Sequence, residues 1–119
     1  MALKDFVRAL QSTDEIEITV IGRSSGRKIT HPVWFAQEGK VLYLLPVKGS
    51  NTEWYKNLLK KRTIALAAKR AKWSAKKVTL IKDPARVRKI ADMFRAKYGA
   101  DEVKKYYSKF DVAVRVPLG

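Results

Sequence analysis

The apolar positions of the chain repeat at helical spacing in four stretches. Intervals of three and four residues predict helices over residues 2–11, from Asn51 or Thr52 into the segment WYKNLL, over 84–98 and over 101–107. The third of these has a strong start in Asp83 and Pro84, because aspartate caps free N–H groups and proline fits the first helical turn. Gly99 is expected to end it.

Alternating or continuous apolar runs predict about six strands. They cover residues 15–21, 29–36, 40–47, 63–70, 76–82 and 110–118. The segments 63–70 and 76–82 are predicted to pair around a connection that holds Lys72 and Trp73. Pro32 lacks a backbone donor, so its strand is expected at an edge, at a bulge or beside a ligand. Because helices and strands do not alternate regularly, we predict a mainly β, antiparallel α+β fold with flanking helices.

Length and composition favour one cytoplasmic domain over residues 1–119. Hydrophobic residues make up 46% of the 119 residues, which is enough for one core. The N-terminal segment is interrupted by charges and does not resemble a secretion signal, and no apolar run approaches the ~18 residues of a membrane span. The absence of cysteine excludes disulfides and thiolate chemistry, and a single histidine makes a metal site implausible.

The charge of the chain points to an anionic partner. Lysine and arginine number 26 against 11 acidic residues, for a formal charge of +15. No acidic residue lies between Glu53 and Asp83, whereas that stretch holds Lys56, Lys60, Lys61, Arg62, Lys69, Arg70, Lys72, Lys76, Lys77 and Lys82. Such a field favours nucleic acid, a phosphorylated cofactor or an acidic membrane surface. A lysine-rich surface that only maintains solubility is the alternative.

Side-chain catalysis finds little support in the sequence. His31 lies in a predicted strand beside Pro32, and no GxSxG turn presents a serine to it, so a structural role or a place at a pocket rim is expected. Carboxylates are few and scattered, and residues 22–26 match neither a P-loop nor a dinucleotide fingerprint. If the protein is an enzyme, a redox cofactor is expected to carry the chemistry.

Two segments have the composition of phosphate-binding sites. The segment GRSSGRK (22–28) places Arg23, Arg27 and Lys28 beside serine hydroxyls and glycines. The segment KGSN (48–51) sets Lys48 before a predicted helix, whose free N–H groups favour an anion. Between these segments, residues 32–35 (PVWF) offer a flat aromatic surface and the backbone of a strand edge.

In order, these motifs resemble a known family. The pattern GR-x-SG-(x)5-P-x-W (22–34), the strand KVLYLL and KGSN-x-x-WY-x-NL (48–58) are similar to deazaflavin-dependent nitroreductases and quinone reductases of the flavin-binding split β-barrel superfamily. The resemblance implies a split β-barrel that binds coenzyme F-420, a deazaflavin, or FMN. It implies hydride transfer from the reduced coenzyme to a quinone, nitro compound or similar acceptor.

The resemblance also implies a set of cofactor contacts. These are Arg23, Ser25, Pro32, Trp34, Lys48, Gly49, Ser50 and Asn51, supported by Trp54 and Asn57. Family members often carry basic residues where Ser24 stands and near Ile29; here Arg27 and Lys28 stand at adjacent positions. The ring is expected against residues 32–35, with its phosphate side toward both basic segments. Tyr106 and Tyr107 are candidate residues near the open ring face.

Three alternatives remain open at the level of sequence. The basic stretch 54–82 could bind nucleic acid, with Trp73 stacking on a base, although nucleic acid ranks below a small anionic coenzyme as the expected partner. The same pocket could hold a coenzyme without turnover. Proteins of the family also include both monomers and homodimers, so a homodimer is compatible with the sequence.

Overall fold

The computed structural model describes residues 2–118 and contains eight strands and four α-helices in this part of the chain. In chain order the elements are α1 (Ala2–Leu10), β1 (Ile16–Ile21), β2 (Lys28–Val33), β3 (Ala36–Glu38), β4 (Val41–Leu44), the 3-10 turn η1 (Gly49–Asn51), α2 (Glu53–Lys60), β5 (Ile64–Ala68), β6 (Ala71–Ala75), β7 (Thr79–Ile81), α3 (Pro84–Tyr98), α4 (Ala100–Tyr106) and β8 (Ala113–Pro117). None of the described helices combines the length and apolar character needed to cross a membrane.

The strands form two antiparallel sheets of four strands each. Their orders are β2-β1-β5-β6 and β3-β4-β8-β7, so β2 lies at an edge, as its proline predicts. The alternating apolar positions of both sheets point inward and build one core, in which Ile18, Leu42 and Val114 are fully buried. The predicted α+β class and the split β-barrel are confirmed.

One predicted strand pairing is wrong. Residues 71–75 were expected in a connection but form β6, which pairs with β5 through Leu66 and Trp73. Residues 79–81 instead pair with β8 in the other sheet. Lysine, alanine and serine dominate β6 and have weak strand preference, so the pairing depends on the tertiary packing of its inward face against α1. Together with a break at residues 34–35, β6 brings the strands to eight rather than about six.

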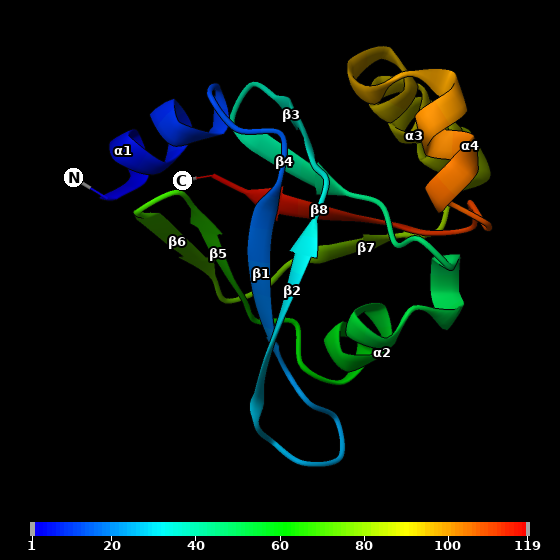
Figure 1. Cartoon of the computed structure of the whole chain (residues 1–119). Coiled ribbons are helices and arrows are strands. Elements are labelled where there is room, and N and C mark those ends of the chain that lie inside the picture. Colours follow the sequence, from blue (N-terminus) through cyan, green and yellow to red (C-terminus); the bar gives the residue numbers. More distant parts are fainter. Residues whose placement is uncertain (1, 119) are drawn as a thin grey trace.

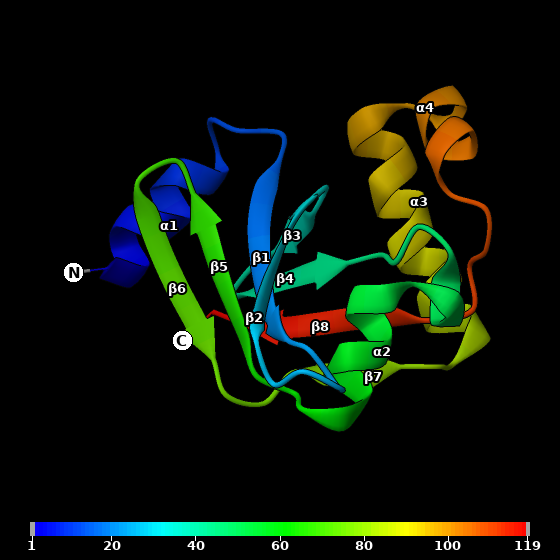
Figure 2. The ribbon, with the colours of Figure 1, turned by 60° about the horizontal axis from the view of Figure 1, so that its bottom comes forward.

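The helices stand at opposite ends of the barrel. In both ribbon views α1 lies beside β5 and β6, whereas α3 and α4 form a pair at the far end (Figures 1 and 2). The predicted start of α3 is confirmed, since Asp83 accepts a hydrogen bond from the Arg86 N–H at 3.2 Å. Val87, Phe94 and Val103 bury their side chains beneath this pair in a second apolar cluster.

The C-terminal end of α3 fixes the point where the chain passes from the first sheet to the second. Phe35 lies there, between β2 and β3, and its N–H donates to the Tyr98 hydroxyl at 3.2 Å. The Phe35 carbonyl accepts a hydrogen bond from Lys97 Nζ at 2.9 Å. The Tyr98 hydroxyl also lies 2.6 Å from the carbonyl oxygen of Asp14. These contacts hold the neighbouring Trp34 in place.

Candidate functional site

A cavity lies between the edge strand β2, the start of α2 and the helix α4. Its volume of about 620 Å³ falls in the range of small-molecule sites. The lining residues are Glu15, His31, Pro32, Val33, Trp34, Leu45, Val47, Lys48, Asn51, Thr52, Glu53, Trp54, Glu102, Tyr106 and Tyr107. We call this space the main cavity.

One wall of the main cavity is a fixed aromatic surface. Trp34 stacks on Tyr98 with ring centroids 4.2 Å apart and nearly parallel planes, and it meets Tyr106 edge-on at 5.6 Å. Burial raises the pKa of Tyr98 to about 12. Tyr106 is 52% exposed at the cavity, whereas Tyr107 is buried, and burial raises its pKa. Both phenols that pack behind Trp34 therefore remain protonated at neutral pH.

The end of the main cavity near α2 favours a negative charge. Lys48 and Asn51 line this end, just before the helix. The Thr52 hydroxyl accepts from the Lys48 N–H at 2.8 Å and makes no capping bond within the described part of α2, contrary to the predicted cap. The first N–H groups of α2 are therefore left without a side-chain cap beside the cavity.

The opposite end of the main cavity carries carboxylates. Glu15 precedes β1, and Glu102 lies four residues before Tyr106, so it shares one face of α4 with that tyrosine. Glu53 also lines the cavity, but Arg23 and Lys56 pair with its carboxylate at 2.8 and 3.7 Å. An anionic ligand group is therefore expected at the α2 end rather than at the α4 end.

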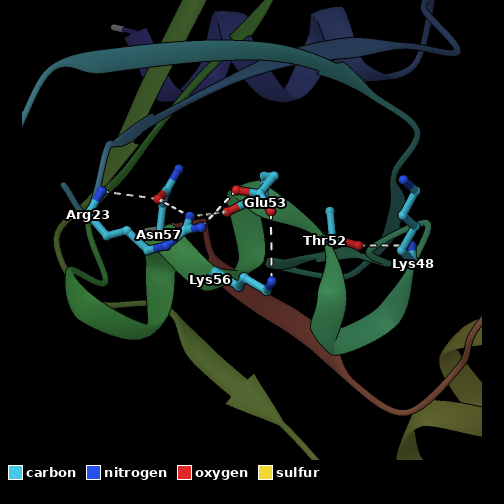
Figure 3. A network of polar contacts seen from close by, with 6 residues as sticks. All are labelled: Arg23, Lys48, Thr52, Glu53, Lys56 and Asn57. Atoms are coloured by element: carbon cyan, nitrogen blue, oxygen red, sulfur yellow. Dashed lines mark hydrogen bonds and ion pairs between the residues drawn. The ribbon is translucent and has the colours of Figure 1, made fainter. Parts of the chain in front are cut away.

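A second, smaller cavity of about 400 Å³ adjoins the turn after β1. It is lined by Ile21, Gly22, Arg23, Ser24, Ser25, Gly26, Lys60 and Lys61. The Arg23 guanidinium is already paired, since it contacts Glu53 Oε1 at 2.8 Å and Asn57 Oδ1 at 2.9 Å. The hydrogen bond and charge of Arg23 lower the pKa of Glu53. Figure 3 shows Arg23 and Lys48 at opposite ends of this polar network.

The residues predicted to contact a cofactor are thus divided among several places. Pro32, Trp34, Lys48, Asn51, Trp54, Tyr106 and Tyr107 line the main cavity, and Arg23 and Ser25 line the second. Arg27, Lys28, Gly49, Ser50 and Asn57 line neither of these two cavities. Asn57 is buried beneath Arg23, whose backbone N–H also donates to Asn57 Oδ1 at 3.0 Å.

The predicted anion site at Ser50 contains a carboxylate of the chain itself. The Ser50 N–H donates to Asp111 Oδ1 at 2.9 Å, and the Ser50 hydroxyl donates to Oδ2 at 2.5 Å. Burial raises the pKa of Asp111, but the Ser50 hydrogen bonds and the charge of Lys109 outweigh it and hold the pKa below its ordinary value. Ser50 is therefore not available to an external phosphate in this conformation.

Several residues that line the main cavity were not predicted from the sequence. Leu45 and Val47 belong to an apolar segment that looks like any core strand. One feature of the sequence could have placed Glu102 beside Tyr106, namely the four-residue spacing between them on a predicted helix. His31 was expected at a pocket rim and does line the main cavity, where its Nε2 is buried without a hydrogen-bond partner among the described residues.

Solved structures of similar shape support the assignment of the fold as a split β-barrel. An F420-H2 Dependent Reductase (FDR-A) superposes with a TM-score of 0.63, at 16% identity over 87% of this chain and 93% of that one. A putative 5-nitroimidazole antibiotic resistance protein from Bacteroides thetaiotaomicron gives 0.72, at 15% identity over 96% and 78%. HutZ, a heme storage protein from Vibrio cholerae, gives 0.69, at 12% identity over 98% and 89%. Identities this low establish the fold alone.

The chain belongs to the family described as "Uncharacterized protein conserved in bacteria (DUF2255)". The model of that family matches residues 6–115, which is nearly the whole chain. No curated protein matches the sequence significantly. The shared fold agrees with the resemblance to split-barrel reductases, and the ligand has to be argued from the site.

Proposed function

We propose that this protein binds a flavin-type coenzyme in the main cavity and acts as an oxidoreductase. The observation that carries the proposal is the pairing, in one cavity, of a fixed aromatic wall at Trp34 with a cationic end at Lys48. A flavin or deazaflavin has the matching parts, a flat ring and an anionic side chain. The reductase among the structures of the same fold supports this choice.

In this proposal the ring lies against Pro32 and Trp34 on the edge strand. Its anionic side is held by Lys48, Asn51 and the free N–H groups at the start of α2. Arg23 contributes through Glu53 and Asn57, which it orients, rather than by direct contact. This assignment replaces the expectation that the phosphate side of the coenzyme contacts both basic segments through Arg23, Ser25, Lys48 and Ser50.

The reaction follows from what the coenzyme supplies and what the residues can add. A bound reduced coenzyme supplies a hydride to an acceptor, for which we propose a quinone, nitro compound or similar group. The exposed ring of Tyr106 would orient a flat acceptor beside the coenzyme ring. Tyr107 is buried and protonated, so it excludes water behind the ring.

Coenzyme F-420 is the preferred ligand and FMN is the alternative. F-420 carries a phosphodiester and a carboxylate-rich tail, which suits a chain of charge +15 better than one phosphate monoester does. The structure weakens the nucleic-acid hypothesis, which used Trp73 to stack on a base. Trp73 is partly buried, and its Nε1–H donates to the Pro117 carbonyl at 3.1 Å. The same cavity could also serve a binding protein without turnover.

Coenzyme affinity of two lysine variants tests the proposed site. Lys48→Ala is expected to weaken binding of F-420 or FMN by about 1.5–3 kcal/mol, or roughly 10- to 150-fold, because a charge-assisted contact is lost. Lys89→Ala, on the exposed face of α3, is the matched control and should leave the dissociation constant unchanged. Equal affinities of wild type and Lys48→Ala would place the ligand elsewhere. Oxidation of pre-reduced coenzyme by a quinone or nitroaromatic then separates an enzyme from a binding protein.

A further inference from the structure

The turn at Gly49 and Ser50 is built around a carboxylate. Both donors of Ser50 point at Asp111, and Lys109 Nζ lies 3.6 Å from Asp111 Oδ2. Gly49 has a φ of +57°, and a Cβ at this position would clash with Asp111 Oδ1. The carboxylate therefore approaches the backbone as closely as a bound anion does at a glycine-containing turn.

The other side of the same turn belongs to the main cavity. Lys48 and Asn51, which flank Gly49 and the Asp111-bound Ser50, both line the cavity. The chain before β8 runs beside this turn through a parallel bridge between Lys48 and Lys109. A short turn is thus held between an internal carboxylate on one side and the proposed ligand site on the other.

We propose that Asp111 is a positioning residue of the coenzyme site: it is the anion bound by the Gly49–Ser50 turn, and through that turn it directs Lys48 and Asn51 into the main cavity. This inference rests on the proposed function. It also explains why a coenzyme phosphate has to use Lys48 and the start of α2, since the donors of Ser50 are already taken.

The contact uses both oxygens of the carboxylate. The two Ser50 donors take separate oxygens of Asp111, whereas an asparagine amide could accept only one of these bonds and would have to donate to the Ser50 hydroxyl instead. The groups facing the carboxylate favour its ionised form. Burial raises the pKa of Tyr55, and the negative charge of Asp111 adds to that rise. The hydroxyl of Tyr55 is buried and has no hydrogen-bond partner among residues 2–118.

Chemical rescue of Asp111→Gly tests the inference. The variant removes the carboxylate and leaves room for acetate. We expect at least tenfold weaker binding of F-420 and FMN, and we expect acetate to restore most of the affinity and raise the melting temperature. Acetamide, which is neutral, and sodium chloride at equal ionic strength should do neither. Asp101→Gly is the control, because Asp101 is exposed on α4 and the variant removes a carboxylate away from the Gly49–Ser50 turn. Its coenzyme affinity and melting temperature should not change when acetate is added.

The outcomes separate positioning from a purely structural role. Wild-type affinity in Asp111→Gly, or a melting temperature that acetate raises while affinity stays low, would overturn the inference. If Asp111→Gly fails to fold, Ser50→Ala provides the test, because it keeps the carboxylate and removes one donor. Ser50→Ala should weaken coenzyme binding severalfold, and unchanged binding would again overturn the inference. Failure of wild type to bind either coenzyme would instead reject the proposed function, while the acetate effect on melting would still report the anion-binding turn.

Discussion

The charged residues around the main cavity differ in what already surrounds them. Arg23 is paired with Glu53 and hydrogen-bonded to Asn57, so its charge is used within the chain. Asp111 is bound by Ser50. Lys48 is exposed at the cavity, and its backbone N–H rather than its ammonium group makes the contact to Thr52. Because its ammonium group has no partner among residues 2–118 and lies next to the start of α2, Lys48 is the residue best placed to meet an anionic ligand.

Substitution of Gly49 measures how closely Asp111 approaches the turn. Gly49→Ala should lower the free energy of unfolding by about 2–4 kcal/mol, because it strains a positive φ and displaces a hydrogen-bonded carboxylate. Gly26→Ala has a similar φ of +71° but open space around the new methyl group, so a loss of about 1–2 kcal/mol is expected. Urea unfolding of both variants gives the comparison. Equal losses would show that Asp111 tolerates the methyl group.

The half-buried hydroxyl of Tyr98 predicts a loss of stability at high pH. Burial raises its pKa from the ordinary value of 10 to about 12, so the folded state holds a proton that the unfolded state releases earlier. The stabilisation is complete below pH 10 and is lost as the pH rises toward 12. Tyr98→Phe should show a smaller decline in unfolding free energy over this range than wild type. Parallel declines would mean that Tyr98 is not the group responsible.

At the scale of elements, α2 is tied to the turn after β1 by one buried amide. Asn57 Oδ1 accepts from both the backbone N–H and the guanidinium of Arg23. Asn57→Ala should cost about 1–3 kcal/mol of unfolding free energy, since it leaves the part-buried Arg23 N–H without its acceptor. Asn51→Ala, at an exposed position, should stay within about 0.5 kcal/mol. A comparable loss for both would contradict the proposed tie, as measured by denaturant unfolding.

Most elements could be predicted from local pattern, and the exceptions have physical causes. The helix at 84–98 and the strand at 15–21 each carry a period and a clear boundary, and both are confirmed within a residue or two. The strand β6 was missed because its residues favour a strand only when packed against α1. In the site, a glycine-containing break before an amphipathic helix indicated Lys48 and Asn51. The contacts of Asp111 and Tyr98 could not be predicted, because their partners lie 61 and 63 residues away in the chain.

At the scale of the whole molecule, the barrel and the helix pair meet around the main cavity. The edge strand β2 and the start of α2 come from the barrel side, and α4 comes from the separate helical cluster (Figure 2). The barrel side supplies the cationic end at Lys48, together with Glu15 and the already paired Glu53, and α4 adds the carboxylate of Glu102. This polarity gives a coenzyme one favoured orientation, with its anionic side toward α2 and its ring toward Trp34.

The most direct measurement is a tryptophan-fluorescence titration of the wild-type protein with coenzyme F-420 and, separately, with FMN. Trp34 and Trp54 line the main cavity, so a ligand seated there should quench their emission. We expect saturable binding, tighter for F-420 than for FMN, with most of the quenching lost in Trp34→Leu. No saturable binding of either coenzyme would contradict the proposed function and leave the fold and family as they stand.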